Sequence, residues 1–178
     1  SEVQAHIDRI TALGAAVRDA ADMRRRLGAL ALERNAASDG TWQPRWRATV
    51  AARLPGARWP ARTLLIPAVD AETGEPVVFD NRSGVDLVDA VAASCSSGLP
   101  YRVGDRWYLD GGYRATAENA DLAAGCARVL VLAPLGGRVL HRTAWTVDLA
   151  AHVARLRAGG SAVAAITPSG EAEHLFGA

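Results

Sequence analysis

Residues 107–112 read WYLDGG, and this stretch says more about the chain than any other. Large apolar residues precede a single carboxylate, Asp110, and two glycines, Gly111 and Gly112, follow it. The apolar residues predict a β-strand. The glycines predict a turn directly after it, because glycine adopts backbone conformations that other residues avoid. Asp followed by Gly is also a common hairpin-turn sequence, so taken alone the stretch indicates a plain turn as readily as a functional carboxylate.

Predicted helices and strands alternate on both sides of this stretch. The spacing of apolar residues predicts helices over residues 3–32, 42–54, 84–94, 145–156 and 168–176. Short apolar runs bounded by turn residues predict strands over residues 62–71, 76–79, 101–103, 106–109, 129–132 and 162–166. The last two are continuous apolar runs, which is typical of strands buried on both faces. Alternating helices and strands predict an α/β fold with a largely parallel sheet.

Composition narrows the class of protein. A chain of 178 residues suits one domain, and 20 basic against 19 acidic residues, interspersed, give no indication of binding to nucleic acid or to an anionic membrane. The run Arg24–Arg26 is interpreted as a solvated helix face. Cys95 and Cys126 lack metal-ligand spacing, so we expect buried, reduced thiols in a cytoplasmic protein. No run of about 20 apolar residues predicts a transmembrane segment. Because Ser1 leads directly into a helical pattern, we expect upstream sequence to be missing.

Six short pieces between Asp70 and Leu135, taken in order, resemble patatin-like phospholipases, especially the bacterial members. The pieces are VDAETGE at 69–75, DNRSGV at 80–85, AVAASC at 90–95, YLDGG at 108–112, NADLA at 119–123 and VLVLAPL at 129–135. The resemblance implies a three-layer α/β/α sandwich with a mostly parallel sheet. Residues 1–178 would be the C-terminal part of one such domain, with a helical segment over 1–56, an α/β portion over 61–178, and the N-terminal part missing.

The same resemblance implies a Ser–Asp dyad. The family's aspartate lies in an Asp-Gly-Gly or Asp-Gly-Ala motif, so it carries over to Asp110 as general base, with Gly111 and Gly112 as its motif partners. The family's nucleophilic serine lies in a G-x-S-x-G elbow, and a glycine-rich loop supplies its oxyanion hole. Neither has a counterpart in these 178 residues. Ser161 follows two glycines but lacks the glycine after it, so we interpret it as structural.

No other residue is predicted to complete a catalytic site. His6, His141, His152 and His174 have no serine elbow to pair with and are interpreted as structural or surface residues. No metal-binding motif or cofactor motif is present, so neither a metal nor a cofactor is expected. The loop over residues 94–100 is expected to line an acyl pocket, with its serines as turn groups. Three further polar residues are interpreted as caps or turn residues: Asp80, Asn81 and Asp121.

These observations predict a lipid acyl hydrolase that carries the aspartate but not the serine, and that is therefore inactive as this chain alone. A carboxylate can act as base directly where a dry site raises its proton affinity, and Trp107, Tyr108 and Tyr113 could supply apolar surroundings. The expected partners are an acyl-ester lipid and either the missing N-terminal part or a second copy, in the cytoplasm or at a membrane surface. Two alternatives stay open: a non-catalytic lipid- or protein-binding module, and a nucleotide-binding module without a G-x-G-x-x-G motif.

Overall fold

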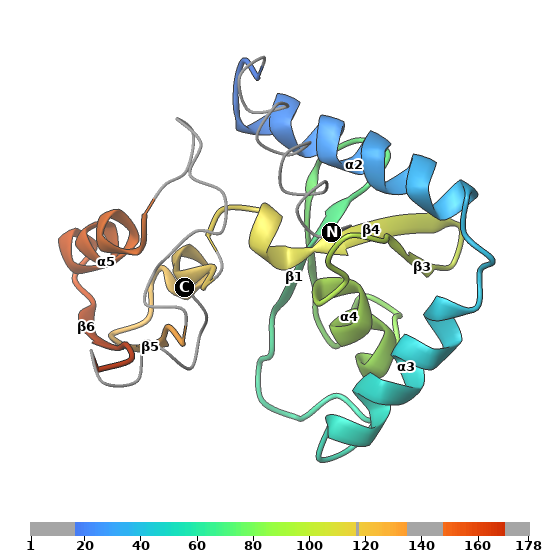
Figure 1. Cartoon of the computed structure of the whole chain (residues 1–178). Coiled ribbons are helices and arrows are strands. Elements are labelled where there is room, and N and C mark those ends of the chain that lie inside the picture. Colours follow the sequence, from blue (N-terminus) through green and yellow to red (C-terminus); the bar gives the residue numbers. More distant parts are fainter. Residues whose placement is uncertain (1–16, 117, 135–147, 170–178) are drawn as a thin grey trace. The chain divides into compact units, whose positions relative to one another are not determined.

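The computed structural model (Figure 1) describes residues 17–116, 118–134 and 148–169. The chain divides into two compact units, Ser1–Arg114 and Ala115–Ala178. Each unit has a sheet of its own. The expectation that 1–178 forms part of a single domain stays a prediction.

The first unit is built on a four-stranded sheet in the order β2-β1-β4-β3. The strands are β1 (Ile66–Asp70), β2 (Pro76–Phe79), β3 (Tyr101–Val103) and β4 (Arg106–Asp110). All three strand pairs are antiparallel, so the prediction of a largely parallel sheet is wrong here. The physical reason lies in the connections: β1–β2 and β3–β4 are joined by short turns, and only antiparallel strands can be joined that way. The broader prediction of a mixed α/β protein is confirmed.

Helices cover both faces of this sheet. Successive side chains of a strand point to opposite faces, and Tyr108 accordingly packs in one apolar cluster while Leu109 packs in the other. Helix α2 (Ala20–Ala36) covers the Leu109 face. Helices α3 (Trp42–Arg53) and α4 (Leu87–Ser94) cover the Tyr108 face. The first unit is therefore a three-layer α/β/α arrangement, as Figure 1 shows.

Indole N–H groups join α3 and the segment that follows it to α4 and the residues just before it. The Nε1 atom of Trp46 donates to the carbonyl oxygen of Ala92 at 3.0 Å, and that of Trp59 donates to Val85 at 2.7 Å. Each tryptophan thus buries apolar surface while its one polar atom stays bonded. The helix predicted over 42–54 is confirmed, and the residues whose four-residue spacing predicted it pack into the apolar cluster on the Tyr108 face.

Several predicted helix boundaries differ from those of the structure. Helix α2 begins after Asp19, whose side chain accepts from the backbone N–H of Asp22 at 2.7 Å. Helix α4 begins at Leu87 instead of Gly84. Asp80 does not cap α4: it accepts from the N–H of Arg82 and so closes a turn ahead of the helix. The predicted helical residues 3–16, 145–147 and 170–176 lie outside the described residues.

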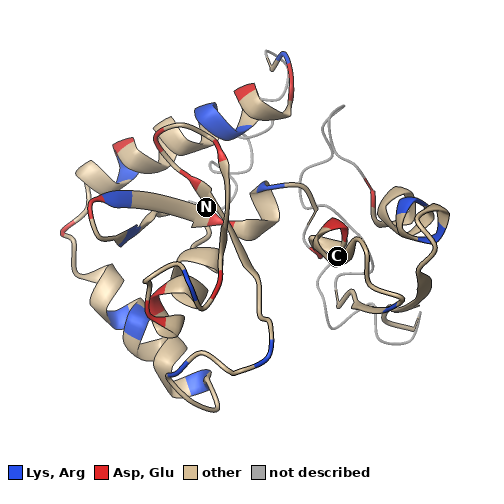
Figure 2. Cartoon of the chain, turned by 180° about the vertical axis from the view of Figure 1, so that it is seen from behind, with Lys and Arg blue, Asp and Glu red and all other residues tan. Residues whose placement is uncertain are grey.

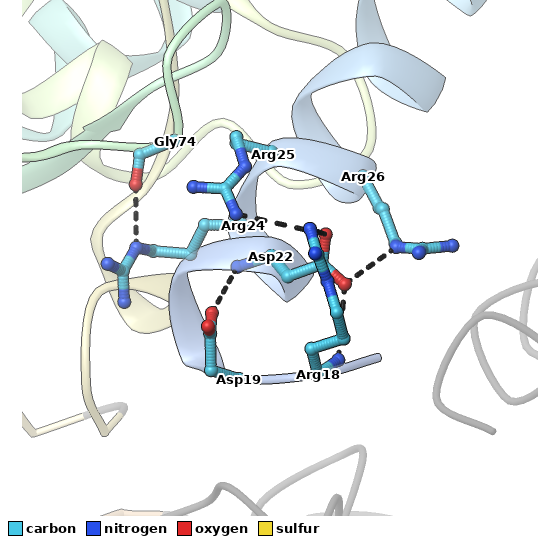
Figure 3. A network of polar contacts seen from close by, with 7 residues as sticks. All are labelled: Arg18, Asp19, Asp22, Arg24, Arg25, Arg26 and Gly74. Carbon is cyan, nitrogen blue, oxygen red and sulfur yellow. Dashed lines mark hydrogen bonds and ion pairs between the residues drawn. The ribbon is translucent and has the colours of Figure 1, made fainter. Parts of the chain in front are cut away.

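The run Arg24–Arg26 is more than a solvated face, which corrects the sequence interpretation. Figure 3 shows Asp22 within reach of several guanidinium groups: Arg26 Nε lies 3.0 Å from its Oδ2 and Arg25 Nη2 lies 3.8 Å from its Oδ1. A hydrogen bond from the backbone of Arg18 is the main cause of a lowered pKa at Asp22, and the bond from Arg26 adds to it. Arg24 Nε donates to the carbonyl oxygen of Gly74 at 2.7 Å, which ties α2 to the β1–β2 turn.

The second unit contains a two-stranded parallel sheet. Strands β5 (Arg128–Leu132) and β6 (Ala162–Ile166) pair in parallel, and helix α5 (Leu149–Ala158) packs on one face through an apolar cluster. On the other face the side chains of Leu130, Leu132 and Ile166 are 61%, 64% and 58% exposed. The prediction that both strands are buried on both faces is therefore wrong: within the described residues only one layer covers this sheet.

Charged residues are scattered over both units, as Figure 2 shows, in keeping with the near-neutral composition. Among the residues that the structure describes, no helix combines the length and the apolar character needed to cross a membrane.

Candidate functional site

Asp110 is the last residue of β4, and a short 3-10 helix, Gly111–Tyr113, follows it directly. The backbone N–H of Asp110 donates to the carbonyl oxygen of Ser96 at 3.2 Å. Its side-chain Oδ1 accepts from the N–H of Gly112 at 2.8 Å. The carboxylate thus caps the 3-10 helix in the way that an Asp caps an α-helix. The Asp-Gly pair is not the turn of a hairpin, so the plain-turn interpretation is wrong in its geometry.

Gly111 is required by how closely the backbone after β4 approaches β1. A Cβ atom at this position would lie 2.3 Å from the carbonyl oxygen of Pro67 and 2.9 Å from its carbonyl carbon. Both are backbone atoms of β1 and cannot rotate away, so any larger residue would force the strands apart. The glycine after Asp110 therefore fixes where the carboxylate lies relative to the sheet.

Asp110 is poised differently from the other aspartate of the sheet, Asp70. Burial raises the pKa of Asp110, and the single hydrogen bond from Gly112 offsets this only in part. Burial also acts to raise the pKa of Asp70. There, however, hydrogen bonds from the backbone of Thr73 and from Arg106, whose Nη1 lies 2.8 Å from Oδ2, win and hold the pKa below its usual value. Where the surroundings of two carboxylates shift their pKa values in opposite directions, the one with the raised pKa is often the group that exchanges protons.

Several polar side chains lie near Asp110, and they come from elements far apart in the sequence. The negative charge of Asp110 adds to burial in raising the pKa of Tyr113. The Tyr113 hydroxyl lies 3.4 Å from the Oγ of Ser97. The positive charge of Arg34, on α2, acts in the opposite direction and offsets part of this rise in the pKa of Tyr113. The result is a cluster around the end of β4 that holds an acid, hydroxyl groups and a nearby cation.

Sequence reasoning found only part of this cluster. It placed Asp110, Gly111 and Gly112, and it named Tyr113 merely as apolar surroundings. It treated Ser97 as a turn group and did not single out Arg34 at all. The only available signal for Arg34 was its position in the last turn of α2, which no local pattern connects to residue 110. The prediction that Cys95 and Cys126 are buried is wrong, since both are exposed.

Ser96, Ser161 and one of the four histidines lie among the described residues. Ser96 is buried, with its Oγ 2.7 Å from the carbonyl oxygen of Ala93, and is structural. The Oγ of Ser161 donates to the carbonyl oxygen of Cys126 at 2.7 Å, just before β6, so its structural interpretation is confirmed. His152 is buried in the second unit, with Nδ1 3.8 Å from Asp121 Oδ1. His6, His141 and His174 lie outside the described residues.

The raised pKa of Asp110 leads to a prediction about stability. The folded chain holds the Asp110 proton more tightly than the unfolded chain, so ionisation of this group costs stability as the pH rises above the ordinary value of 3.8. Asp110→Asn keeps an oxygen that can accept from Gly112 and removes the buried charge. We expect the variant to be more stable than the wild type at neutral pH, with an advantage that shrinks as the pH is lowered toward 3.8. Urea unfolding across this pH range measures it; a variant less stable at neutral pH would contradict it.

No protein-family model matches this chain, and no curated protein matches it closely enough to count as a relative.

Proposed function

We propose that this chain is part of a patatin-like serine hydrolase that cleaves acyl esters of lipids, and that Asp110 is its general base. The sequence resemblance over 70–135 supports the family, and the environment of Asp110 supports the role. The observation that carries the proposal is a partly buried carboxylate at a strand end whose pKa is raised by burial. A serine from outside these 178 residues is the nucleophile.

The proposed reaction needs a base with a raised proton affinity. The serine oxygen attacks the ester carbonyl carbon, and the serine proton passes to Asp110 as the bond forms. Asp110 then gives that proton to the departing alcohol, which leaves an acyl-serine. Water then attacks the carbonyl carbon of the acyl-serine and gives a proton to Asp110. Asp110 passes that proton to the serine oxygen as the ester bond breaks, which releases the acid and restores the serine. A carboxylate with an ordinary pKa takes such protons poorly, whereas one raised toward the working pH takes them better.

The test is covalent labelling with a fluorophosphonate, which reacts with activated serines. We expect no stoichiometric labelling of this chain alone. The complete gene product that contains it should be labelled at one serine, and mass spectrometry should map the adduct outside these 178 residues. Labelling of any serine within the chain would overturn the proposal, and so would a complete gene product that the probe does not label at all.

One observation favours a second function, a non-catalytic binding module. The exposed leucines and isoleucine of the β5–β6 sheet, Leu130, Leu132 and Ile166, form an apolar face of a kind that associates with protein or lipid. Concentration-dependent self-association in sedimentation experiments, abolished by Leu132→Ser, together with a complete gene product that the fluorophosphonate fails to label, would favour this second function.

A further inference from the structure

The charges of the chain are balanced overall, but one stretch of it is wholly basic. Residues 40–69 contain five arginines and no acidic residue, whereas acidic residues outnumber basic ones in the rest of the chain. The stretch includes α3 and the irregular segment that leads to β1. In Figure 2 the blue of its arginines recurs along the helix and the loop after it, at the lower edge of the first unit. The near-neutral total therefore hides a local positive surface.

Three of these arginines are exposed and have no partner in the described part of the chain. Arg53 ends α3, and Arg58 and Arg62 follow it in the irregular segment. None of the three forms an ion pair or a side-chain hydrogen bond with another described residue. Together they are named the arginine surface. Because like charges repel, an anionic partner that bridges these side chains is favoured.

Arg47, on the same helix, shows which chemistry satisfies an arginine here. Its Nε lies 2.8 Å from Asp89 Oδ1, and its Nη2 lies 3.7 Å from Asp86 Oδ2. One guanidinium thus meets two carboxylates, the pairing that its planar fork of donors fits best. The arginine surface carries the same chemical group three times, but no carboxylate of the described residues reaches it.

The tryptophans of the same stretch argue against two other anionic partners, a membrane and a nucleic acid. Trp42, Trp46 and Trp59 all pack against the apolar cluster between α3, α4 and the sheet. A bilayer surface is bound by aromatic and leucine side chains that insert into it, and single-stranded nucleic acid by aromatic rings that stack on its bases. These three rings are turned inward instead. Leu65, 39% exposed, is the one large apolar side chain exposed among the described residues of the first unit.

We propose that the arginine surface binds an extended acidic segment of a partner protein, whose carboxylates pair with Arg53, Arg58 and Arg62. The chain from Arg53 to Arg62 spans at most about 30 Å even when fully extended, so an acidic segment of similar length reaches all three. Guanidinium–carboxylate pairs are charge-assisted hydrogen bonds with a defined geometry, which gives such binding its specificity. The surface includes none of the residues around Asp110, so the inference does not rest on the proposed function.

Fluorescence anisotropy with a labelled peptide of about ten glutamates, long enough to span the surface, tests the proposal. A glycine–serine peptide of the same length and label is the neutral control. We expect saturable binding of the acidic peptide alone. The binding should weaken as sodium chloride is raised toward about 0.5 M, because salt screens exposed charges.

Substitution of the arginines locates the binding. The triple variant R53Q/R58Q/R62Q should bind the acidic peptide about tenfold more weakly, the combined effect of three exposed ion pairs. The matched control R82Q/R128Q/R155Q removes three exposed arginines from the β2–α4 loop, β5 and α5 and should bind as the wild type does. Circular dichroism checks that each variant is folded. If the triple variant does not fold, Arg58→Gln alone should weaken binding about twofold.

Competition assigns the class of partner. Unlabelled glutamate peptide should displace the labelled one at a lower concentration than either a single-stranded oligodeoxynucleotide or vesicles rich in phosphatidylserine. Three outcomes would overturn the inference: no saturable binding of the acidic peptide, a control triple variant that weakens binding as much as R53Q/R58Q/R62Q does, or displacement by the oligonucleotide or the vesicles at a lower concentration than by the peptide.

Discussion

Gly28→Ala is expected to destabilise the first unit by about 2 kcal/mol, although alanine is the better helix former by about 1 kcal/mol. A Cβ atom at Gly28 would lie 1.9 Å from the carbonyl oxygen of Ala71 and 2.8 Å from its carbonyl carbon. Both are backbone atoms, so the helix must move away from the end of β1. That movement also loosens the contact of Leu27 and Ala31 with Leu109. Overpacking therefore outweighs helix propensity at this position.

Urea unfolding of the variant measures this effect, and Gly56→Ala is its control. Gly56 lies in the segment after α3, and no atom lies within 4 Å of where its Cβ would be. Its substitution should change the free energy of unfolding by no more than about 0.5 kcal/mol, as is usual at open surface sites. A Gly28→Ala variant as stable as the wild type would show that α2 does not pack on β1 as closely as the structure has it.

Local patterns predicted the elements of the first unit well. The strand predicted over 62–71, which in the structure covers Ile66–Asp70, the turn at Thr73–Glu75 and the strand at 76–79 are each encoded within a few residues, because turn chemistry and strand propensity act over that range. The hairpin over 101–110 is encoded in the same way by Gly104-Asp105. The sequence predicted these strands and their turns correctly, yet the conclusion of a mostly parallel sheet contradicted the hairpins that it contained.

Features that depend on distant contacts could not be predicted in this way. An apolar run such as 129–132 shows that a strand is apolar on both sides, but not how many layers cover it, so the exposure of Leu130 and Leu132 was missed. Cys95 was taken as buried from its residue type alone. The need for glycine at residue 28 could not be predicted either, because it arises from the carbonyl group of Ala71, 43 residues further along the chain.

The candidate site also contains residues that local sequence identifies and residues that only distant contacts bring to the site. Asp110 could be singled out because its glycines and its strand are its neighbours in sequence. Tyr113 could be named but given no role, since its hydroxyl acquires partners only when the loop containing Ser97 folds beside it. Arg34 reaches this region only because α2 packs across β4. Helix packing, and not any motif, therefore decides which cation lies near the proposed base.

Asp110→Asn in the complete gene product is expected to lower kcat/KM for a p-nitrophenyl ester by about 10²- to 10⁴-fold, the usual contribution of a general base. The amide keeps the hydrogen bond to Gly112 but cannot take a proton. Asp105→Asn, an exposed carboxylate in the turn between β3 and β4, is the control and should retain full activity. Steady-state assays of both variants give the comparison, and unchanged activity of Asp110→Asn would rule out its role as base.

The combination of activity and stability makes this test more decisive than activity alone. An aspartate whose only task is to cap the 3-10 helix should lose little of either on replacement by asparagine, because both side chains offer the same acceptor. A residue that is structurally essential should lose both together. A buried base is different: its charge costs stability in the folded state, so replacing it raises the free energy of unfolding at neutral pH, while the loss of its proton acceptor lowers turnover. Only this third pattern, activity lost and stability gained, fits a carboxylate kept at the end of β4 for catalysis.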